Sequence, residues 1–170
     1  PAGDTLPVLM ELEAKVIIVD SQGNTVELPI QDVLKGPNKT ALNYDQTVIG
    51  VRIPKKKGNW ISTFTKLGSR TAVTIAKLSL ALNIEYDAED NVIKTARVGL
   101  GSVGKTAFRS VKMEELLQNK KATKELADQF AEELSAEIER AIPGRASLPY
   151  KREAVKGVAY EVFQNLFWGN

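Results

Sequence analysis

The alternation of apolar and polar side chains over residues 76–86 constrains the fold of this chain more than any other feature. The apolar positions are Ala76, Leu78, Leu80, Leu82, Ile84 and Tyr86, and the residues between them are Lys77, Ser79, Ala81, Asn83 and Glu85. A period of two places neighbouring side chains on opposite faces of a β-strand. The pattern therefore predicts a strand with one row in a core and the other in water.

A second alternating segment follows after a short polar turn. Residues 87–91 (DAEDN) predict the turn, and the apolar positions resume at Val92, Ala96, Val98 and Leu100. Two such segments around a turn are typical of an antiparallel hairpin. Residues 60–67 supply a third strand, so we expect an antiparallel sheet with one buried face.

The rest of the chain changes from strands to helices. Residues 15–20 and 45–54 predict strands, and Asp4 can cap a short helix before them. Beyond residue 110, apolar residues recur at helical spacing, with Thr123 as an expected N-cap and Ser147 near the start of the last helix. Strands followed by helices predict an α+β fold, in which the helices cover one side of the sheet.

Cysteine and histidine are both absent from the sequence. This excludes disulfides, thiolate nucleophiles, iron–sulfur clusters held by this chain's own thiolates and a serine hydrolase with a histidine base. Three possibilities remain for this chain: catalysis by carboxylates or lysines, chemistry carried out by a bound cofactor, or no catalysis at all. The acidic residues are scattered as solvated charges are, so a stand-alone carboxylate enzyme is the weakest alternative. We expect no catalytic residue and no metal site in this chain.

The charge and hydropathy of the chain bear on its partners and location. The formal net charge is +2, too small to indicate nucleic-acid binding. No apolar run approaches the roughly 20 residues that a membrane span needs, and no basic-then-apolar leader is visible. We therefore expect a cytoplasmic protein without a nucleic-acid or membrane partner.

Several segments, taken in order, resemble the flavoprotein module of the molybdenum hydroxylases, the family of xanthine, nicotinate and carbon monoxide dehydrogenases. They are PAGDTLPVLMELEAKV, which is similar to the family's S-P-x-x-D-x-x-P segment, F-x-K-x-x-x-R at Phe64, Lys66 and Arg70, IAKLSLAL, and ARVGLGSVGKTAFRS. The resemblance covers essentially the whole chain.

The resemblance implies a specific division of the α+β fold. Residues 1–58 would be the C-terminal portion of an FAD-binding domain, with an antiparallel sheet. Residues 59–170 would be the flavoprotein C-terminal domain, a small antiparallel sheet backed by a three-helix bundle. Family members also carry an N-terminal lobe whose glycine-rich turns hold the FAD pyrophosphate. Nothing in this sequence supplies an equivalent, so we expect that missing N-terminal FAD lobe as a partner.

The resemblance also implies cofactor-binding residues. The aspartate that matches Asp4 hydrogen-bonds the flavin in the family, and the small residues Ala2 and Gly3 would let a ligand approach the backbone. Taken alone, Asp4 is equally well explained as a helix N-cap.

Lys66 is the second expected contact with the cofactor. In the family the matching lysine reaches the flavin, whereas a strand lysine taken alone is usually solvated. Val48 and Ile49 match a hydrophobic position that packs on the flavin ring.

A glycine-rich run at residues 99–104 is similar to a phosphate-binding loop. It follows a strand, but no helix is expected directly after it, so the dinucleotide fingerprint fails in context. Glycines at a strand end explain the run better.

Together these features predict an oxidoreductase subunit that is not catalytic as an isolated chain. The resemblance implies that the whole enzyme oxidises its substrate at a molybdenum cofactor on another polypeptide. Electrons would pass through iron–sulfur clusters on a partner subunit to FAD, and then to NAD or another acceptor. The alternative is a non-catalytic assembly module of the same fold that has lost flavin binding. The substrate, the acceptor and the oligomeric state stay open.

Overall fold

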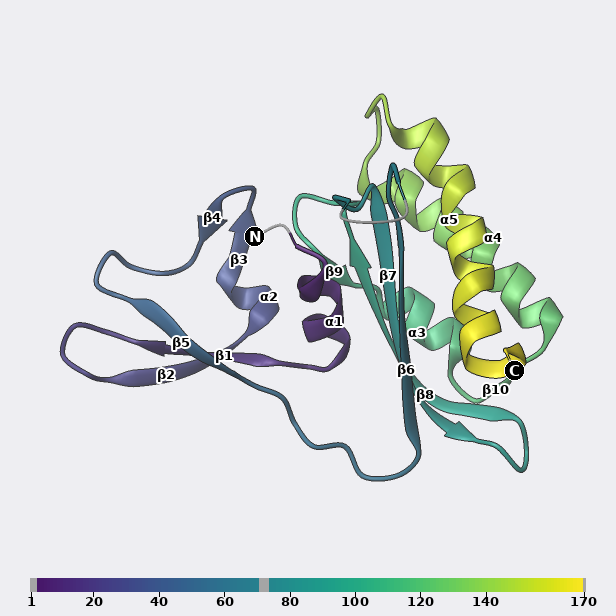
Figure 1. The fold of residues 1–170 in the computed structure, drawn as a ribbon, viewed down its shortest axis with the longest axis horizontal. Helices are drawn as coiled ribbons and strands as arrows, with labels where there is room; N and C mark the ends of the chain where they lie inside the picture. The colour runs from purple at the N-terminus through teal and green to yellow at the C-terminus, as the bar shows by residue number, and fades with distance from the viewer. Residues whose placement is uncertain (1–2, 71–73, 170) are drawn as a thin grey trace.

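The computed structural model describes residues 3–70 and 74–169. A small lobe formed by residues early in the chain stands beside a larger sheet that is covered by helices (Figure 1). No helix within these residues is long and apolar enough to cross a membrane.

The small lobe is built on a three-stranded antiparallel sheet of order β2-β1-β5. Its strands are β1 (Lys15–Val19), β2 (Thr25–Pro29) and β5 (Thr47–Arg52). The connection between β2 and β5 holds the short helix α2 (Ile30–Val33) and the hairpin β3 (Leu34–Gly36) and β4 (Lys39–Thr40). A register shift between Ile17 and Ile18 interrupts the pairing of β1 with β5. The strands expected at 15–20 and 45–54 are therefore confirmed.

The larger sheet contains the predicted hairpin. Its strands are β6 (Trp60–Leu67), β7 (Leu78–Asp87), β8 (Val92–Gly101), β9 (Phe108–Arg109) and β10 (Lys120–Lys121). The order is β10-β8-β7-β6, with β9 also paired to β8, and every pairing is antiparallel. Leu82 pairs with Val98, so the two apolar rows of the hairpin face the same core.

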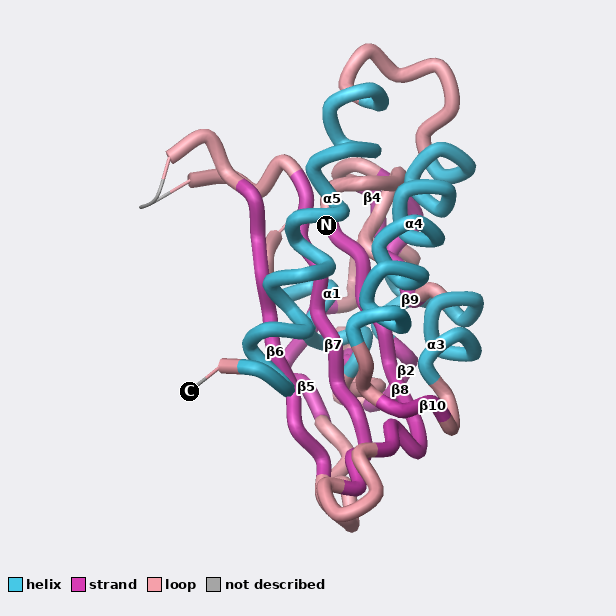
Figure 2. Tube along the Cα trace, turned by 90° about the vertical axis from the view of Figure 1, so that its right-hand side faces the viewer, coloured by secondary structure: helices cyan, strands magenta, loops and turns pink. Residues whose placement is uncertain are grey.

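Helices from the second half of the chain cover one face of this sheet (Figure 2). They are α3 (Val111–Leu117), α4 (Lys124–Ala141), α5 (Leu148–Phe163) and the π-helical turn η1 (Gln164–Trp168). The Thr123 hydroxyl accepts a hydrogen bond from the Leu126 N–H, so the predicted cap is confirmed. Phe130 and Phe163 are fully buried between the helices and the sheet. These findings confirm the α+β fold.

The opposite face of the sheet differs from the expectation. Ser79, Ala81 and Asn83 were expected in water, but their exposed fractions are only 0%, 0% and 3%. The helix α1 (Thr5–Glu11) packs against β7 and β8 on this face, across the sheet from α4 and α5 (Figure 1). Small and neutral side chains fit equally well under a helix or in water, so their alternation could not reveal the second covered face.

Candidate functional site

Asp4 and Lys66 form an ion pair at the start of α1. The Nζ atom of Lys66 lies 2.5 Å from Oδ2 of Asp4 and also donates a hydrogen bond of 3.1 Å to the carbonyl oxygen of Thr74. Both side chains are about one-third exposed. Lys66 is therefore held between two acceptors, which contradicts the interpretation of a freely solvated strand lysine.

The role of Asp4 in the helix is also clear. It occupies the N-cap position of α1, but its carboxylate accepts no hydrogen bond from the backbone of that helix. The capping interpretation is thus correct in position and wrong in chemistry. The Asp4 carboxylate accepts a hydrogen bond from Lys66 instead, so it stabilises the ion pair and does not cap the helix.

An apolar hollow of about 410 Å³ lies beside this pair. Its lining residues come from α1 and its two caps, from the residue after β5 and from β6, and they are Asp4, Thr5, Val8, Leu9, Leu12, Ile53 and Phe64. Ile53 and Phe64 are 49% and 36% exposed, so the hollow is open to solvent. An apolar surface with a few polar groups at its edge is typical of small-molecule sites.

The sequence anticipated only part of this hollow. Phe64 and Lys66 were recognised through one motif, and their spacing of two puts both on the same face of β6. Val8 and Leu12 have helical spacing, which was a usable signal. Ile53 was missed, because nothing local indicates that the residue after β5 would meet α1.

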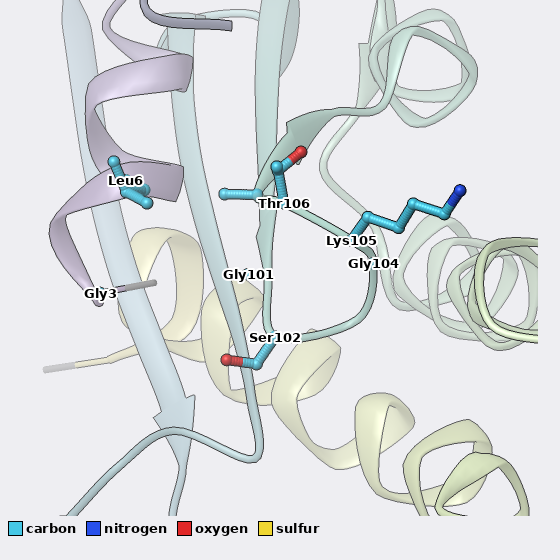
Figure 3. Close-up of a pocket in the computed structure, with 8 residues that line it drawn as sticks. Gly3, Leu6, Gly101, Ser102, Gly104, Lys105 and Thr106 are labelled. Carbon is cyan, nitrogen blue, oxygen red and sulfur yellow. The ribbon is translucent and has the colours of Figure 1, made fainter. Parts of the chain in front are cut away.

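The other expected contact residues lie elsewhere. Val48 and Ile49 are exposed on β5 and are not among the residues that line the hollow. Ala2 lies outside the described residues. Gly3 lines a smaller cavity of about 70 Å³, together with Leu6 and the loop after β8 (Figure 3).

The loop after β8 contains the glycine-rich run that is similar to a phosphate loop. The strand β9 follows it, and the next helix, α3, begins only at Val111. The Lys105 side chain extends away from the other lining residues (Figure 3). The loop therefore lacks the helix N-terminus that a dinucleotide-binding motif requires.

A second charged cluster surrounds Glu13, the residue after Leu12, which is the C-cap of α1. The carboxylate of Glu13 accepts hydrogen bonds from Arg97 at 3.0 Å, from Arg109 at 3.2 Å and from Lys56. Burial opposes ionisation, but the hydrogen bonds and charges of Lys56 and Arg97 lower the pKa of Glu13 to about 2. The cluster joins the small lobe to β8 and β9. No local pattern indicates this cluster, because its members are far apart in the chain.

Glu11 is a buried acid on α1. It is 2% exposed, and its Oε2 atom has no hydrogen-bond partner among the residues that the structure describes. Burial raises its pKa to about 8, although the charge of Lys56 acts in the opposite direction. Glu11 is therefore mainly protonated at neutral pH. No group of three or more His, Cys, Asp and Glu residues within the described ranges could hold a metal ion.

Two family models match the chain. Residues 63–166 match the CO dehydrogenase flavoprotein C-terminal domain. Residues 1–56 match the FAD binding domain in molybdopterin dehydrogenase. The Asp4–Lys66 pair therefore joins a residue from each matched region.

Curated relatives match almost the whole chain. The glyceraldehyde dehydrogenase medium chain of Sulfolobus acidocaldarius is 29% identical over 166 residues, which are 98% of this chain and 57% of that protein. The nicotinate dehydrogenase FAD-subunit of Eubacterium barkeri is 24% identical over 168 residues, which are 97% of this chain and 56% of that protein. The chain thus spans little more than half the length of these relatives.

Solved structures share the fold. Carbon monoxide dehydrogenase from Hydrogenophaga pseudoflava superposes with a TM-score of 0.79 at 20% identity, over 93% of this chain and 54% of that one. Quinoline 2-oxidoreductase from Pseudomonas putida 86 gives a TM-score of 0.78 at 22% identity, over 94% and 54% of the two chains. At these identities the likeness concerns the fold alone.

Proposed function

The chain belongs to the family of CO dehydrogenase flavoprotein C-terminal domains, and we propose that it acts as part of the FAD-containing subunit of a molybdenum hydroxylase. In this role it contributes one side of the flavin site and carries no bond-breaking chemistry of its own. One observation carries the proposal: Asp4 and Lys66 meet at the edge of an apolar hollow, at the junction of the two matched regions.

The residues present fit an isoalloxazine ring. The hollow offers apolar side chains for a flat aromatic surface, with Phe64 on β6 and Ile53 after β5. The ion pair offers an acceptor, Asp4, directly beside a donor, Lys66. The pyrimidine end of a flavin presents an N–H between carbonyl groups, which is complementary to such a donor and acceptor.

FAD supplies the electron-accepting chemistry when it is bound. This chain's residues would hold and tune it. Asp4 would accept from the ring N–H, and Lys66 would donate to a ring carbonyl and favour negative charge nearby. Phe64 and Ile53 would exclude water from the apolar part of the ring. Four further residues remain proposed contacts, and they would touch parts of FAD that extend beyond this hollow: Val48, Ile49, Ala2 and Gly3.

The wider assembly is proposed on the same basis. This chain covers only 57% and 56% of the medium chain and FAD-subunit relatives, so a lobe that holds the FAD pyrophosphate would complete the site. The boundary between residues 58 and 59 would separate the FAD-binding portion from the C-terminal domain. Electrons would come from iron–sulfur clusters on one partner subunit, with molybdenum cofactor on another, and would leave to NAD or a different acceptor.

Flavin content tests the proposal. The native protein complex that contains this chain is purified, its visible absorption spectrum is recorded, and FAD released by denaturation is quantified. We expect about one FAD per chain. A complex that assembles normally but contains no flavin would contradict the proposal and favour the assembly module instead.

A further inference from the structure

The side chains beneath α1 decrease in size from β6 to β8. Two rows of directly paired residues run across the three strands on the face that α1 covers. The first row is Lys66, Ser79 and Gly101, and the second is Phe64, Ala81 and Gly99. Directly opposed residues of neighbouring strands share a face of the sheet. The sheet surface is therefore raised at β6 and low at β8.

α1 uses the low side of this surface. A Cβ atom added at Gly99 would lie 2.1 Å from the carbonyl oxygen of Pro7, and one at Gly101 would lie 3.1 Å from Cγ of Pro7. The backbone of α1 thus passes directly over β8. This close approach is possible only because residue 99 is a glycine and has no Cβ atom. Side-chain atoms at these positions would force α1 away from the sheet.

The same rows connect this contact to the candidate flavin site. Gly101 and Lys66 stand at opposite ends of one row, and Asp4 lies three positions before Pro7 on the same helix end. When Pro7 rests on β8, Asp4 reaches Lys66 at 2.5 Å. Beyond the other end of α1, Glu13 is held by Arg97, Arg109 and Lys56. A rise of α1 over β8 would therefore act on its N-terminal end, where the N-cap Asp4 is held by the single ion pair with Lys66.

We propose that Gly99 and Gly101 are positioning residues for the flavin site, which act by setting the height of α1 and hence the placement of Asp4 against Lys66. The inference rests on the proposed function, since it assigns these glycines a role in FAD binding. It gives the glycine-rich run a purpose other than phosphate binding. Ser79 contributes to the same close packing, because its Oγ atom lies 2.3 Å from the Cβ position of Gly101 and has no hydrogen-bond partner within residues 3–70 and 74–169.

The test uses the native flavoprotein and three variants. Gly101→Ala adds the obstructing methyl group. The double variant Ser79→Gly with Gly101→Ala adds the same methyl group but removes the Ser79 hydroxyl, which is the atom nearest to it. Gly157→Ala is the matched control, because Gly157 is exposed on α5 and an added Cβ meets nothing within 4 Å. The measurements are the FAD dissociation constant, the reduction potential of bound FAD and the melting temperature.

We expect Gly101→Ala to raise the FAD dissociation constant about tenfold or more, the loss expected when a charge-assisted hydrogen bond is displaced. Its reduction potential should shift, because the charges of Asp4 and Lys66 move relative to the ring. The double variant relieves the clash with Ser79 but keeps the contact with Pro7, so it should fold more stably than Gly101→Ala and still bind FAD more weakly than the wild type. Gly157→Ala should bind FAD as the wild type does, with equal or higher stability.

Several outcomes would overturn the inference. A folded Gly101→Ala protein with wild-type affinity and potential would show that α1 height does not matter for FAD. If Gly101→Ala does not fold, the double variant decides, because it still carries the Cβ atom 3.1 Å from Cγ of Pro7: wild-type affinity and potential in the double variant would show that the contact with α1 does not matter for FAD. A wild-type protein without FAD would overturn the proposed function and this inference together. Failure of the inference alone leaves flavin in the wild type.

Discussion

Asp4 and Lys66 are 62 residues apart in the chain, yet their side chains meet at 2.5 Å. Asp4 belongs to the short helix α1, and Lys66 belongs to β6 of the larger sheet. The two charges largely neutralise each other, so a bound ligand would experience the field of a dipole rather than that of a single cation. This changes what substitution of either residue is expected to do.

The first prediction concerns the redox effect of the pair in the FAD-loaded protein. Lys66→Met removes the positive charge and leaves the Asp4 carboxylate unpaired, so reduction, which adds negative charge, becomes less favourable. The reduction potential should fall by on the order of tens of millivolts. In Asp4→Asn with Lys66→Met both charges are absent, and the potential should return toward the wild-type value. Redox titration with bound FAD quantified provides the measurement. An unchanged potential in Lys66→Met at full FAD occupancy would remove Lys66 from the flavin site.

The second prediction is that the 170-residue chain alone binds FAD weakly. The described residues offer an apolar hollow and one ion pair for the ring, but the glycine-rich loop after β8 leads to a strand rather than to a helix N-terminus. Anchoring a pyrophosphate needs an array of backbone N–H groups. Calorimetric titration should give a dissociation constant above about 1 μM, which corresponds to roughly −8 kcal/mol. Submicromolar binding would mean that this chain holds the phosphates itself.

The third prediction concerns pH. Burial raises the pKa of Glu11 to about 8, with Lys56 as the opposing charge, so the folded state keeps a proton that the unfolded state loses above its ordinary pKa of 4.5. Stability should therefore decrease as pH rises from about 4.5 to about 8 and then level off, with a total change on the order of a few kcal/mol. Glu11→Gln imitates the protonated acid and should remove this decrease.

Thermal unfolding between pH 5 and 9 (roughly the span of the two pKa values) measures the effect of Glu11. Glu89→Gln is the control, because Glu89 is exposed in the hairpin turn and should keep the wild-type pH dependence. Identical pH profiles for the wild type and Glu11→Gln would show that the Glu11 carboxyl finds a partner or water that offsets its burial.

The fourth prediction tests the burial of both faces of β7. Leu82→Ala should cost about 2–5 kcal/mol, since Leu82 is fully buried against the helices. Ala81→Leu should also destabilise, by about 1–3 kcal/mol, because Ala81 is fully buried under α1 and has no room for a larger side chain. Glu89→Ala should change stability by less than about 0.5 kcal/mol. Denaturant unfolding measures the free energy of unfolding of each variant. If Ala81→Leu leaves this free energy unchanged, α1 can move away from the sheet at little cost.

Local patterns predicted the elements of the fold well. The alternation before and after residues 87–91 identified β7 and β8, and Leu82 and Val98 do face one core. Thr123 was recognised as a helix cap from residue type and position alone. These successes have one physical reason: periodicity and capping depend on neighbours a few positions away, which the sequence displays directly.

The sequence by itself determined the antiparallel hairpin, the helices that follow it and, through its motifs, the importance of Asp4 and Lys66. The tertiary structure alone decided that these two residues meet, that α1 buries Ser79 and Ala81, and that Glu11 loses contact with water. Charge pairs and buried acids depend on which distant segments pack together, and that packing leaves no local periodicity. Gly99 shows the difference most clearly, because only the carbonyl of Pro7 above it explains why no side chain fits there.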